Sequence, residues 1–351
     1  MSQQISVCII AKNEEKYIET CLQALKPFDV EIVVVDTGST DKTKEIATKY
    51  TDSLYDFEWI GDFSAARNYA AKMAKHDYIF ALDCDEFIEK FSISDICKML
   101  KKEPNSSLAI SINNVVGSGN SISKFFSEAD RIYDRRFVHF VNRIHEQLAA
   151  KDSNSKVLRK VINTSVLHMG YYLTPEEKLK KNERNIELLL KQIEEMPDDC
   201  YSYFQLGQSY AEIKENEKAY EARKKALSLK PPVSFEFMDQ LLVGYAKSAL
   251  DMGKYEDALS VLDYYDDMKN VADYMFYLGQ AYYANGRLEE ALKTFELATK
   301  CEIVHAQGTN SFFPYNAMAL LYEKLGENEK AVMYSQMAQD ALSKAYNLDK
   351  K

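Results

Sequence analysis

The stretch that decides the fold is Tyr78-Ile-Phe-Ala-Leu-Asp-Cys-Asp-Glu-Phe87, an apolar run that ends abruptly in three acids. A short apolar run of this composition is typical of a buried strand in a parallel sheet. Because ligands of open α/β sheets bind at the carboxyl ends of the strands, we expect the acids at a binding edge. If the strand continues, Asp83 and Asp85 point to the same side. Such a pair suits a hard divalent cation that also holds phosphate oxygens.

The same acids have a purely structural interpretation, in which Asp85 or Glu86 is the N-cap of the next helix. Because Asp-x-Asp pairs are common in proteins, the capping role is the preferred interpretation when the pair is considered alone. The metal-site hypothesis therefore depends on the elements that precede the pair in the chain.

Length and composition limit the class of protein. The 351 residues are enough for two domains, and a net charge of -10 with a pI of about 5.2 argues against nucleic acid as a partner. Six cysteines without C-x-x-C spacing fit a reduced, cytoplasmic compartment better than a disulfide framework or a zinc site. We expect no membrane span and no signal peptide, because no apolar run approaches the roughly 20 residues that a span needs.

Apolar runs alternate with amphipathic stretches along the first half. Strands are expected at 5–10, 31–35, 53–57 and 78–82, and helices at 13–25, 42–49 and 63–75, with Asn13 capping the first helix. This alternation requires a parallel, right-handed, doubly wound sheet. A further helix is expected at 92–101, followed by strands at 108–116, 135–141 and 160–168, some of them antiparallel.

Two polar residues stand at informative places in this pattern. Asp36 ends the second strand, where a carboxylate can accept a hydrogen bond from a base N–H or a ribose hydroxyl, or form a local Asx turn. Arg67 lies among small residues of the third helix, so it can reach a nucleotide; the alternative is a solvated arginine. Because no Gly-x-Gly-x-x-Gly or Walker A pattern follows the first strand, a dinucleotide oxidoreductase is disfavoured.

Four segments in this order and spacing carry a resemblance: Val7-Cys-Ile-Ile-Ala-Lys-Asn-Glu-Glu15, Val33-Val-Val-Asp-Thr-Gly-Ser-Thr-Asp41, Ala66-Arg-Asn68 and Leu82-Asp-Cys-Asp-Glu86. Residues 1 to about 170 resemble a family 2 glycosyltransferase with the GT-A fold, a Rossmann-like, mostly parallel α/β sheet. The resemblance implies transfer of a sugar from a nucleoside diphosphate sugar, usually with inversion. It also implies a divalent cation, Mn²⁺ or Mg²⁺, at the Asp-x-Asp (DxD) motif.

Carried over by matching position, the resemblance also implies individual roles. A late histidine is a third metal ligand in many GT-A enzymes, so His168 is a candidate, although a lone histidine is equally often structural. The other implied contacts are Ala11 and Glu14 beside the nucleoside, Asp36 and Arg67 on the base (commonly uracil), Asp83 near the ribose and the metal, and Asp85 on the metal.

A catalytic base is also required, because the acceptor hydroxyl must lose a proton. We predict Glu146, since relatives with a repeat-domain extension tend to carry a His-Glu pair at this place, and we expect the neighbouring His145 to position the acceptor. The structural alternative is a salt bridge between Glu146 and Arg143 or Arg135. Asp130 and Asp134 are the fallback bases.

The second half of the chain changes in composition from Thr174, which begins a helix as its cap with Pro175 at the first position. Four units with tetratricopeptide spacing follow, marked by equivalent alanines at 219, 258, 291 and 331. We therefore predict a GT-A domain over 1–172, a linking helix over 173–198, and an all-α tetratricopeptide-repeat solenoid of about four helix pairs over 199–351.

Two functions from different classes fit this organisation. The first is an inverting, metal-dependent glycosyltransferase of the hexosyltransferase class that uses a nucleotide sugar, with a UDP-sugar as first candidate. Its repeats would hold a polypeptide acceptor or form a homodimer. The second is a repeat-mediated interaction protein with a degenerate nucleotide-binding domain. The complete set of Asp36, Arg67, Asp83 and Asp85 favours the enzyme, but neither the sugar nor the acceptor can be read from the sequence.

Overall fold

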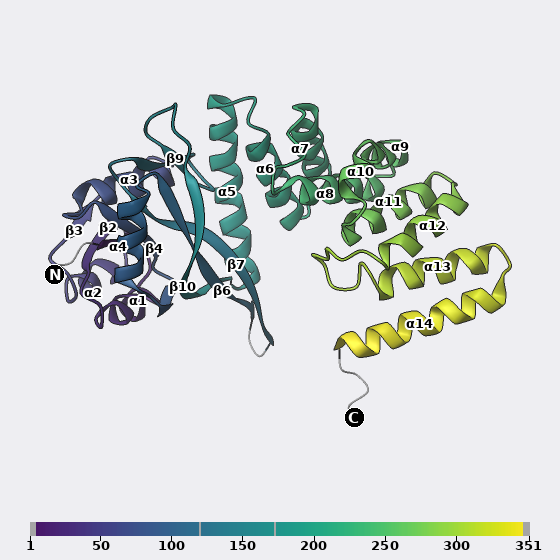
Figure 1. Cartoon of the computed structure of the whole chain (residues 1–351), viewed down its shortest axis with the longest axis horizontal. Coiled ribbons are helices and arrows are strands. Elements are labelled where there is room, and N and C mark those ends of the chain that lie inside the picture. Colours follow the sequence, from purple (N-terminus) through teal and green to yellow (C-terminus); the bar gives the residue numbers. More distant parts are fainter. Residues whose placement is uncertain (1–4, 119–120, 172, 347–351) are drawn as a thin grey trace. The chain divides into compact units, whose positions relative to one another are not determined.

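The computed structural model describes residues 5–118, 121–171 and 173–346, with the side chains of 118, 121 and 122 outside the description. The chain divides into two compact units, Met1–Leu188 and Leu189–Lys351 (Figure 1). The domain limits expected at 172 and 198 stay predictions. Within the part of the chain that is described, no helix is long and apolar enough to cross a membrane.

The first unit is built on an eight-stranded sheet in the order β3-β2-β1-β4-β7-β6-β10-β5. Strands β3, β2, β1 and β4 are parallel, β7 is antiparallel to both of its neighbours, β10 is parallel to β6, and β5 is antiparallel to β10. The predicted mostly parallel α/β sheet is thus confirmed. The strands are β1 Ile5–Ala11, β2 Glu31–Asp36, β3 Leu54–Asp56, β4 Tyr78–Asp83, β5 Glu86–Lys90, β6 Ser106–Ser118, β7 Ser121–Asp134 and β10 Leu158–Tyr171, with β8 Val138–Val141 and β9 Gln147–Ala150 in a separate two-stranded sheet.

Helices cover both faces of this sheet. Helices α1 Ile18–Leu25, α2 Thr43–Ala47 and α4 Ile93–Lys102 bury their apolar residues in one core with Ile5, Val7 and Ile9 of β1. Helix α3 Phe63–Met73 packs on the other face, in a core that includes Cys8. Successive residues of β1 therefore face opposite layers, as the period of two in a strand requires.

Two expectations for this unit are wrong. The first helix begins at Ile18, because Asn13 adopts a left-handed conformation with φ of 57° and its side chain accepts the N–H of Thr40 instead of capping. The acids after β4 do not cap a helix: Glu86 begins strand β5, and α4 begins only at Ile93. The N-cap interpretation of the acidic stretch is therefore excluded.

The strand expected at 135–141 is also shorter, because β7 ends at Asp134 and β8 begins at Val138. Strand β7 itself was not predicted. It forms a long antiparallel pair with β6, and its residues 123–128 are exposed. A strand with so little buried apolar surface lacks the periodic signal on which sequence analysis depends.

The second unit consists of paired helices, preceded by α5 Pro175–Glu195, which runs from the first unit into the second. Thr174 caps α5 as predicted: its Oγ1 accepts the N–H of Glu177, and its own N–H donates to the Glu177 carboxylate. The helices that follow are α6 Cys200–Glu212, α7 Asn216–Ser228, α8 Met238–Asp251, α9 Tyr255–Leu259, α10 Tyr265–Met268, α11 Ala272–Ala284, α12 Leu288–Ala298, α13 Phe312–Lys324 and α14 Asn328–Tyr346, with a 3₁₀ turn at Ser260–Tyr264.

Glycines on α6 and α11 allow the partner helix to approach closely. A Cβ atom at Gly279 would lie 2.6 Å from the Phe295 ring of α12, and one at Gly207 would lie 2.7 Å from the Arg223 side chain of α7. These distances are shorter than van der Waals contact. The helix pairs therefore depend on the absence of a side chain at these positions.

We predict that Gly279→Ala lowers the free energy of unfolding by about 1–3 kcal/mol, because the added methyl group overpacks the Phe295 ring. Helix propensity alone would change stability in the opposite direction, by about 1 kcal/mol. Urea titrations of Gly279→Ala, Phe295→Leu and the double variant test this contact. The two substitutions should be less than additive, because the smaller side chain makes room for the methyl group. A stabilised Gly279→Ala protein would contradict the prediction.

Candidate active site

The parallel strands bring the predicted donor-binding residues to one edge of the sheet. Ala11 pairs with Asp36 across β1 and β2, and Ile10 pairs with Asp83 across β1 and β4. The carboxyl ends of three neighbouring strands therefore meet there, as expected for a ligand-binding edge. Arg67 reaches the same edge from α3.

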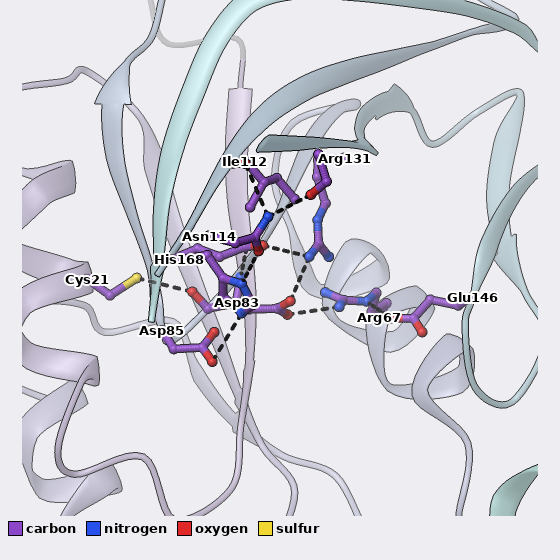
Figure 2. Close-up of polar contacts among 11 residues, drawn as sticks. Cys21, Arg67, Asp83, Asp85, Ile112, Asn114, Arg131, Glu146 and His168 are labelled. Atoms are coloured by element: carbon purple, nitrogen blue, oxygen red, sulfur yellow. Dashed lines mark hydrogen bonds and ion pairs between the residues drawn. The ribbon is translucent and has the colours of Figure 1, made fainter. Parts of the chain in front are cut away.

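Five charged side chains form a buried network at this edge (Figure 2). Arg67 donates from Nη2 to Asp83 Oδ1 at 2.8 Å and from Nε to Glu146 Oε1 at 2.5 Å. Arg131 Nη2 lies 2.7 Å from both Asp83 Oδ2 and Glu86 Oε1. Arg67 is only 6% exposed, so the alternative of a solvated arginine is excluded.

The network shifts the pKa values of its carboxyl groups in opposite directions. Burial alone would raise the pKa of Asp83, but the charges of Arg131 and Arg67 outweigh it and hold that pKa well below its usual range. Burial raises the pKa of Glu86, and the nearby charge of Asp83 adds to the rise although Arg131 opposes it. Asp83 therefore stays ionised at neutral pH, and Arg131 is the cation that opposes the rise in the pKa of Glu86.

Glu146, the predicted base, is joined to Arg67 rather than to Arg143 or Arg135. Burial would raise its pKa, but the Arg67 charge and hydrogen bond lower it below the usual value, so the carboxylate is ionised at neutral pH. The neighbouring His145 has a φ of 51°, and burial lowers its pKa, which favours the neutral imidazole.

The fallback base Asp134 lies at the wrong end of the sheet. It pairs with Tyr78, at the start of β4, five residues before Asp83, which corresponds to roughly 16 Å along a strand. Its carboxylate is fully buried and bonded to Arg136. The other fallback, Asp130, accepts a hydrogen bond from Ser107 and pairs with Arg159.

Asp36 combines features of both of its sequence-based interpretations. Its Oδ1 accepts the N–H groups of Gly38 and Ser39 at 3.0 and 2.9 Å, which is the local turn. Its Oδ2 is buried and has no hydrogen-bond partner. An unsatisfied buried carboxylate oxygen is costly, so this atom is available for a donor from a ligand.

Glu14 and Ala11 flank this position at the end of β1. The Ala11 carbonyl accepts both the N–H and the hydroxyl of Thr37, which ties the ends of β1 and β2 together. Glu14 is half-buried, and burial, followed by the charges of Asp85 and Asp83, raises its pKa to about 7.

The two aspartates of the acidic motif serve different partners, because β4 ends at Asp83 and a turn follows (Figure 2). The expectation that both carboxylates point to one side depended on a continuing strand and is wrong for this reason. Asp83 binds arginines, whereas Asp85 Oδ2 lies 3.5 Å from Nε2 of His168. The motif therefore divides into a network residue and a residue that faces the late histidine.

His168 is oriented as a metal-ligating histidine would be. Its Nδ1 lies 2.7 Å from Asn114 Oδ1, and the Asn114 amide nitrogen donates to the Ile112 carbonyl and the Ser127 hydroxyl. These bonds leave the oxygen of Asn114 for the ring, so Nδ1 donates to it and Nε2 faces Asp85. Burial alone would lower the pKa of His168, but the hydrogen bond and the charge of Asp85 raise it. Metal-binding histidines are commonly held in this way.

Gly170 lets Asp85 and His168 approach each other, because a Cβ atom there would overlap Asp85 Oδ2 and His168 Nε2. The described residues contain no cluster of three potential metal-binding side chains. Two protein ligands fit a divalent cation whose other ligands are phosphate oxygens and water. Asp85 and His168 fit this role, whereas both oxygens of Asp83 are already bonded to arginines.

Sequence analysis missed three residues of this site: Glu86, Asn114 and Arg131. Arg131 and Asn114 lie on the β6–β7 pair, whose exposed, polar second strand offered no sequence signal. Glu86 was considered only as a cap. No alternation of polar and apolar residues marks 127–133, Ser-Glu-Ala-Asp-Arg-Ile-Tyr, so no local pattern placed Arg131 on a strand.

Comparisons with known proteins agree with this architecture. Residues 6–161 match the model of glycosyl transferase family 2, and residues 201–232 and 272–302 match tetratricopeptide-repeat models. The chain therefore has an N-terminal family 2 glycosyltransferase domain followed by C-terminal tetratricopeptide repeats.

Among curated proteins, the chain is 26% identical over 227 residues to the SPbeta prophage-derived glycosyltransferase SunS of Bacillus subtilis, covering 64% of this chain and 53% of SunS. It is 31% identical over 139 residues to the poly(ribitol-phosphate) beta-N-acetylglucosaminyltransferase TarS of Staphylococcus aureus, covering 37% of this chain and 24% of TarS. The chain thus spans about half or less of the length of these relatives. A crystal structure of MamA is similar with a TM-score of 0.41 and 19% identity, over 50% of this chain and 99% of MamA.

We predict that Arg131→Met lowers the free energy of unfolding by about 3 kcal/mol, because it removes a counter-ion from the buried Glu86 and the half-buried Asp83. Arg159→Met is the matched control: Arg159 also pairs with two carboxylates but is 39% exposed, and it should cost less than about 1 kcal/mol. Urea titration at pH 7 measures both. Equal costs for the two variants would contradict a special role for the buried network.

The lowered pKa of Asp83 predicts a pH-dependent effect of Asp83→Asn. A carboxyl group whose folded pKa is depressed contributes stability that is present above its unfolded pKa, about 3.9, and lost as the pH falls. The variant should therefore be clearly less stable than the wild type at pH 7, and the difference should narrow from about pH 5 downward. Chemical denaturation at pH 7, 5 and 4 tests this, and a constant difference would contradict it.

Proposed function

We propose that the N-terminal domain transfers a sugar from a nucleoside diphosphate sugar to an acceptor, with inversion at the anomeric carbon. The observation that carries the proposal is the orphaned Asp36 Oδ2 at the sheet edge where β4 ends and Asp85 faces His168. In a domain of family 2, a nucleotide sugar needs a contact for its base and a cation for its diphosphate. Asp36 is proposed to supply the first, and Asp85 with His168 the second.

The unsatisfied oxygen of Asp36 favours a nucleobase with a donor on its edge. Uracil offers a single N3–H, which one free carboxylate oxygen can accept. A UDP-sugar is therefore the first candidate donor. Ala11 and Glu14, at the end of β1, are proposed to flank the nucleoside.

Asp85 and His168 are the residues proposed to hold a divalent cation, Mn²⁺ or Mg²⁺. When bound, such a cation neutralises charge that develops on the leaving diphosphate. Asp83 is proposed to act beside it by keeping Arg67 and Arg131 in place at the ribose end of the site.

Glu146 is proposed as the base. Its ion pair with Arg67 keeps the carboxylate ionised and therefore able to take a proton. In the transfer step, a bond forms between the acceptor oxygen and the anomeric carbon as the bond from that carbon to the diphosphate oxygen breaks. The electron pair leaves with the diphosphate, and the acceptor proton passes to Glu146. Attack on the face opposite the diphosphate gives inversion. Neutral His145 can accept a hydrogen bond from the acceptor.

The repeats are proposed to present a polypeptide acceptor, since solenoids of this class offer extended binding surfaces. A homodimer through the repeats is the other use that the sequence suggests. The described cysteines are all unpaired, which suits a reducing compartment such as the cytoplasm. The name of the relative TarS adds N-acetylglucosamine to the sugars worth testing.

We predict that the purified chain releases the nucleoside diphosphate from a sugar donor in the presence of Mn²⁺ or Mg²⁺, and that Asp85→Ala lowers this rate at least a hundredfold. Loss of a metal ligand removes several kcal/mol of stabilisation of the leaving group. A panel that includes UDP-glucose and UDP-N-acetylglucosamine, read by mass spectrometry, is the measurement. Asp95→Ala, on the exposed start of α4, is the control and should keep full activity.

Two results would contradict the proposal. One is full activity of Asp85→Ala. The other is a wild-type protein that neither turns over any donor nor gains thermal stability with any nucleotide. That second result would favour the interaction protein with a degenerate transferase domain.

A further inference from the structure

The first half of α5 reaches the donor site although it lies beyond the residues that match the family model, which end at 161. Lys181 and Arg184 are three residues apart on this helix, so they share one face. Both belong to the first unit together with the sheet. The inference concerns these two cations and rests on the proposed function.

Lys181 lies next to the proposed cation ligands. Its Nζ is 3.4 Å from the Gly170 carbonyl and 4.9 Å from the centre of the Tyr171 ring. The Tyr171 ring in turn meets the His168 ring edge-on at 5.2 Å, and His168 faces Asp85. Gly170 is the residue against which both ligands converge. The ammonium group of Lys181 therefore contacts residues, Gly170 and Tyr171, that themselves adjoin the proposed cation ligands.

Arg184 lies at the other side of the site. Its guanidinium is 5.2 Å from the centre of the Phe63 ring, at the start of α3. Phe63 donates its N–H to the carbonyl of Arg143, three residues before Glu146. The two cations of α5 therefore approach the end of β10 and the segment of the proposed base.

The balance of charge explains why these cations matter. Arg67 and Arg131 already form ion pairs with Asp83, Glu86 and Glu146. Lys181 and Arg184, by contrast, make no ion pair with a carboxylate among the described residues. A diphosphate that arrives beside acidic side chains needs positive charge that is not already neutralised, and a cation aimed at phosphate oxygens supplies a strong, charge-assisted hydrogen bond.

We propose that Lys181, with Arg184 beside it, binds the diphosphate of the donor. Lys181 contacts its non-bridging oxygens and stabilises the electron pair that stays on the diphosphate when the bond to the sugar breaks. No proton moves in this contact. The linking helix thereby completes a donor site that the family 2 domain leaves short of positive charge.

Calorimetric titration of the full chain with UDP and with uridine tests this contact, because only UDP carries the diphosphate. Lys181→Gln should weaken UDP binding about tenfold and leave uridine binding unchanged, since it removes one hydrogen bond to a charged group. Lys181→Arg should retain most of the affinity. The matched control is Lys180→Gln, which removes an exposed pair with Glu176 on the outer face of the helix and should alter neither affinity.

The outcomes separate this inference from the function on which it rests. If the wild type binds UDP and Lys181→Gln binds it equally well, with Mg²⁺ and with EDTA, the diphosphate role of Lys181 is wrong and the proposed function survives. If UDP and uridine weaken together, Lys181 supports the fold and not the diphosphate, which also overturns the inference. If the wild type binds none of UDP, GDP, CDP and ADP, both proposals fail.

Discussion

The buried ion pairs between Asp83 and its two arginines are the interaction on which the rest of the site depends. They join the end of β4 to α3 through Arg67 and to β7 through Arg131, and they reach Glu146 through the second bond of Arg67. Burying such charges is expensive, and the cost is offset only when the geometry is good and the remaining hydrogen-bonding groups are satisfied. Each carboxylate oxygen of Asp83 has its own guanidinium partner, whereas Arg67 Nη1 and Arg131 Nε are buried without a hydrogen-bond partner.

In this network the two aspartates of the Asp-x-Asp motif have different partners, and only the second is proposed as a cation ligand. Asp83 binds two arginines, and Asp85 and His168 are the pair that we propose to hold a cation. The division arises because the strand ends between the two aspartates, so the second one is on a turn and faces β10. Gly170 and Asn114 then fix the geometry of the second site from β10 and β6.

Helix α5 links these observations to the organisation of the whole chain. It begins with a capping box at Thr174, carries Lys181 and Arg184 in the first unit, and continues into the unit of repeats. A helix that served only as a spacer would not need the Lys181 ammonium group beside Gly170. In the proposed mechanism, the helix contributes to the donor site as well as connecting the domains.

The sequence by itself determined the alternation of strands and helices, the acidic end of β4, and the repeat spacing, because buried strands and paired helices leave periodic apolar patterns. It also placed Asp36 and the acids after β4 at one edge of the sheet, since parallel strands bring their carboxyl ends together. Only the tertiary structure decided which charges pair. Arg131 is 48 residues from Asp83, Glu146 is 79 residues from Arg67, and no local pattern encodes such contacts. Burial then assigned the protonation states, because the cost of a charge depends on the surroundings that the fold creates.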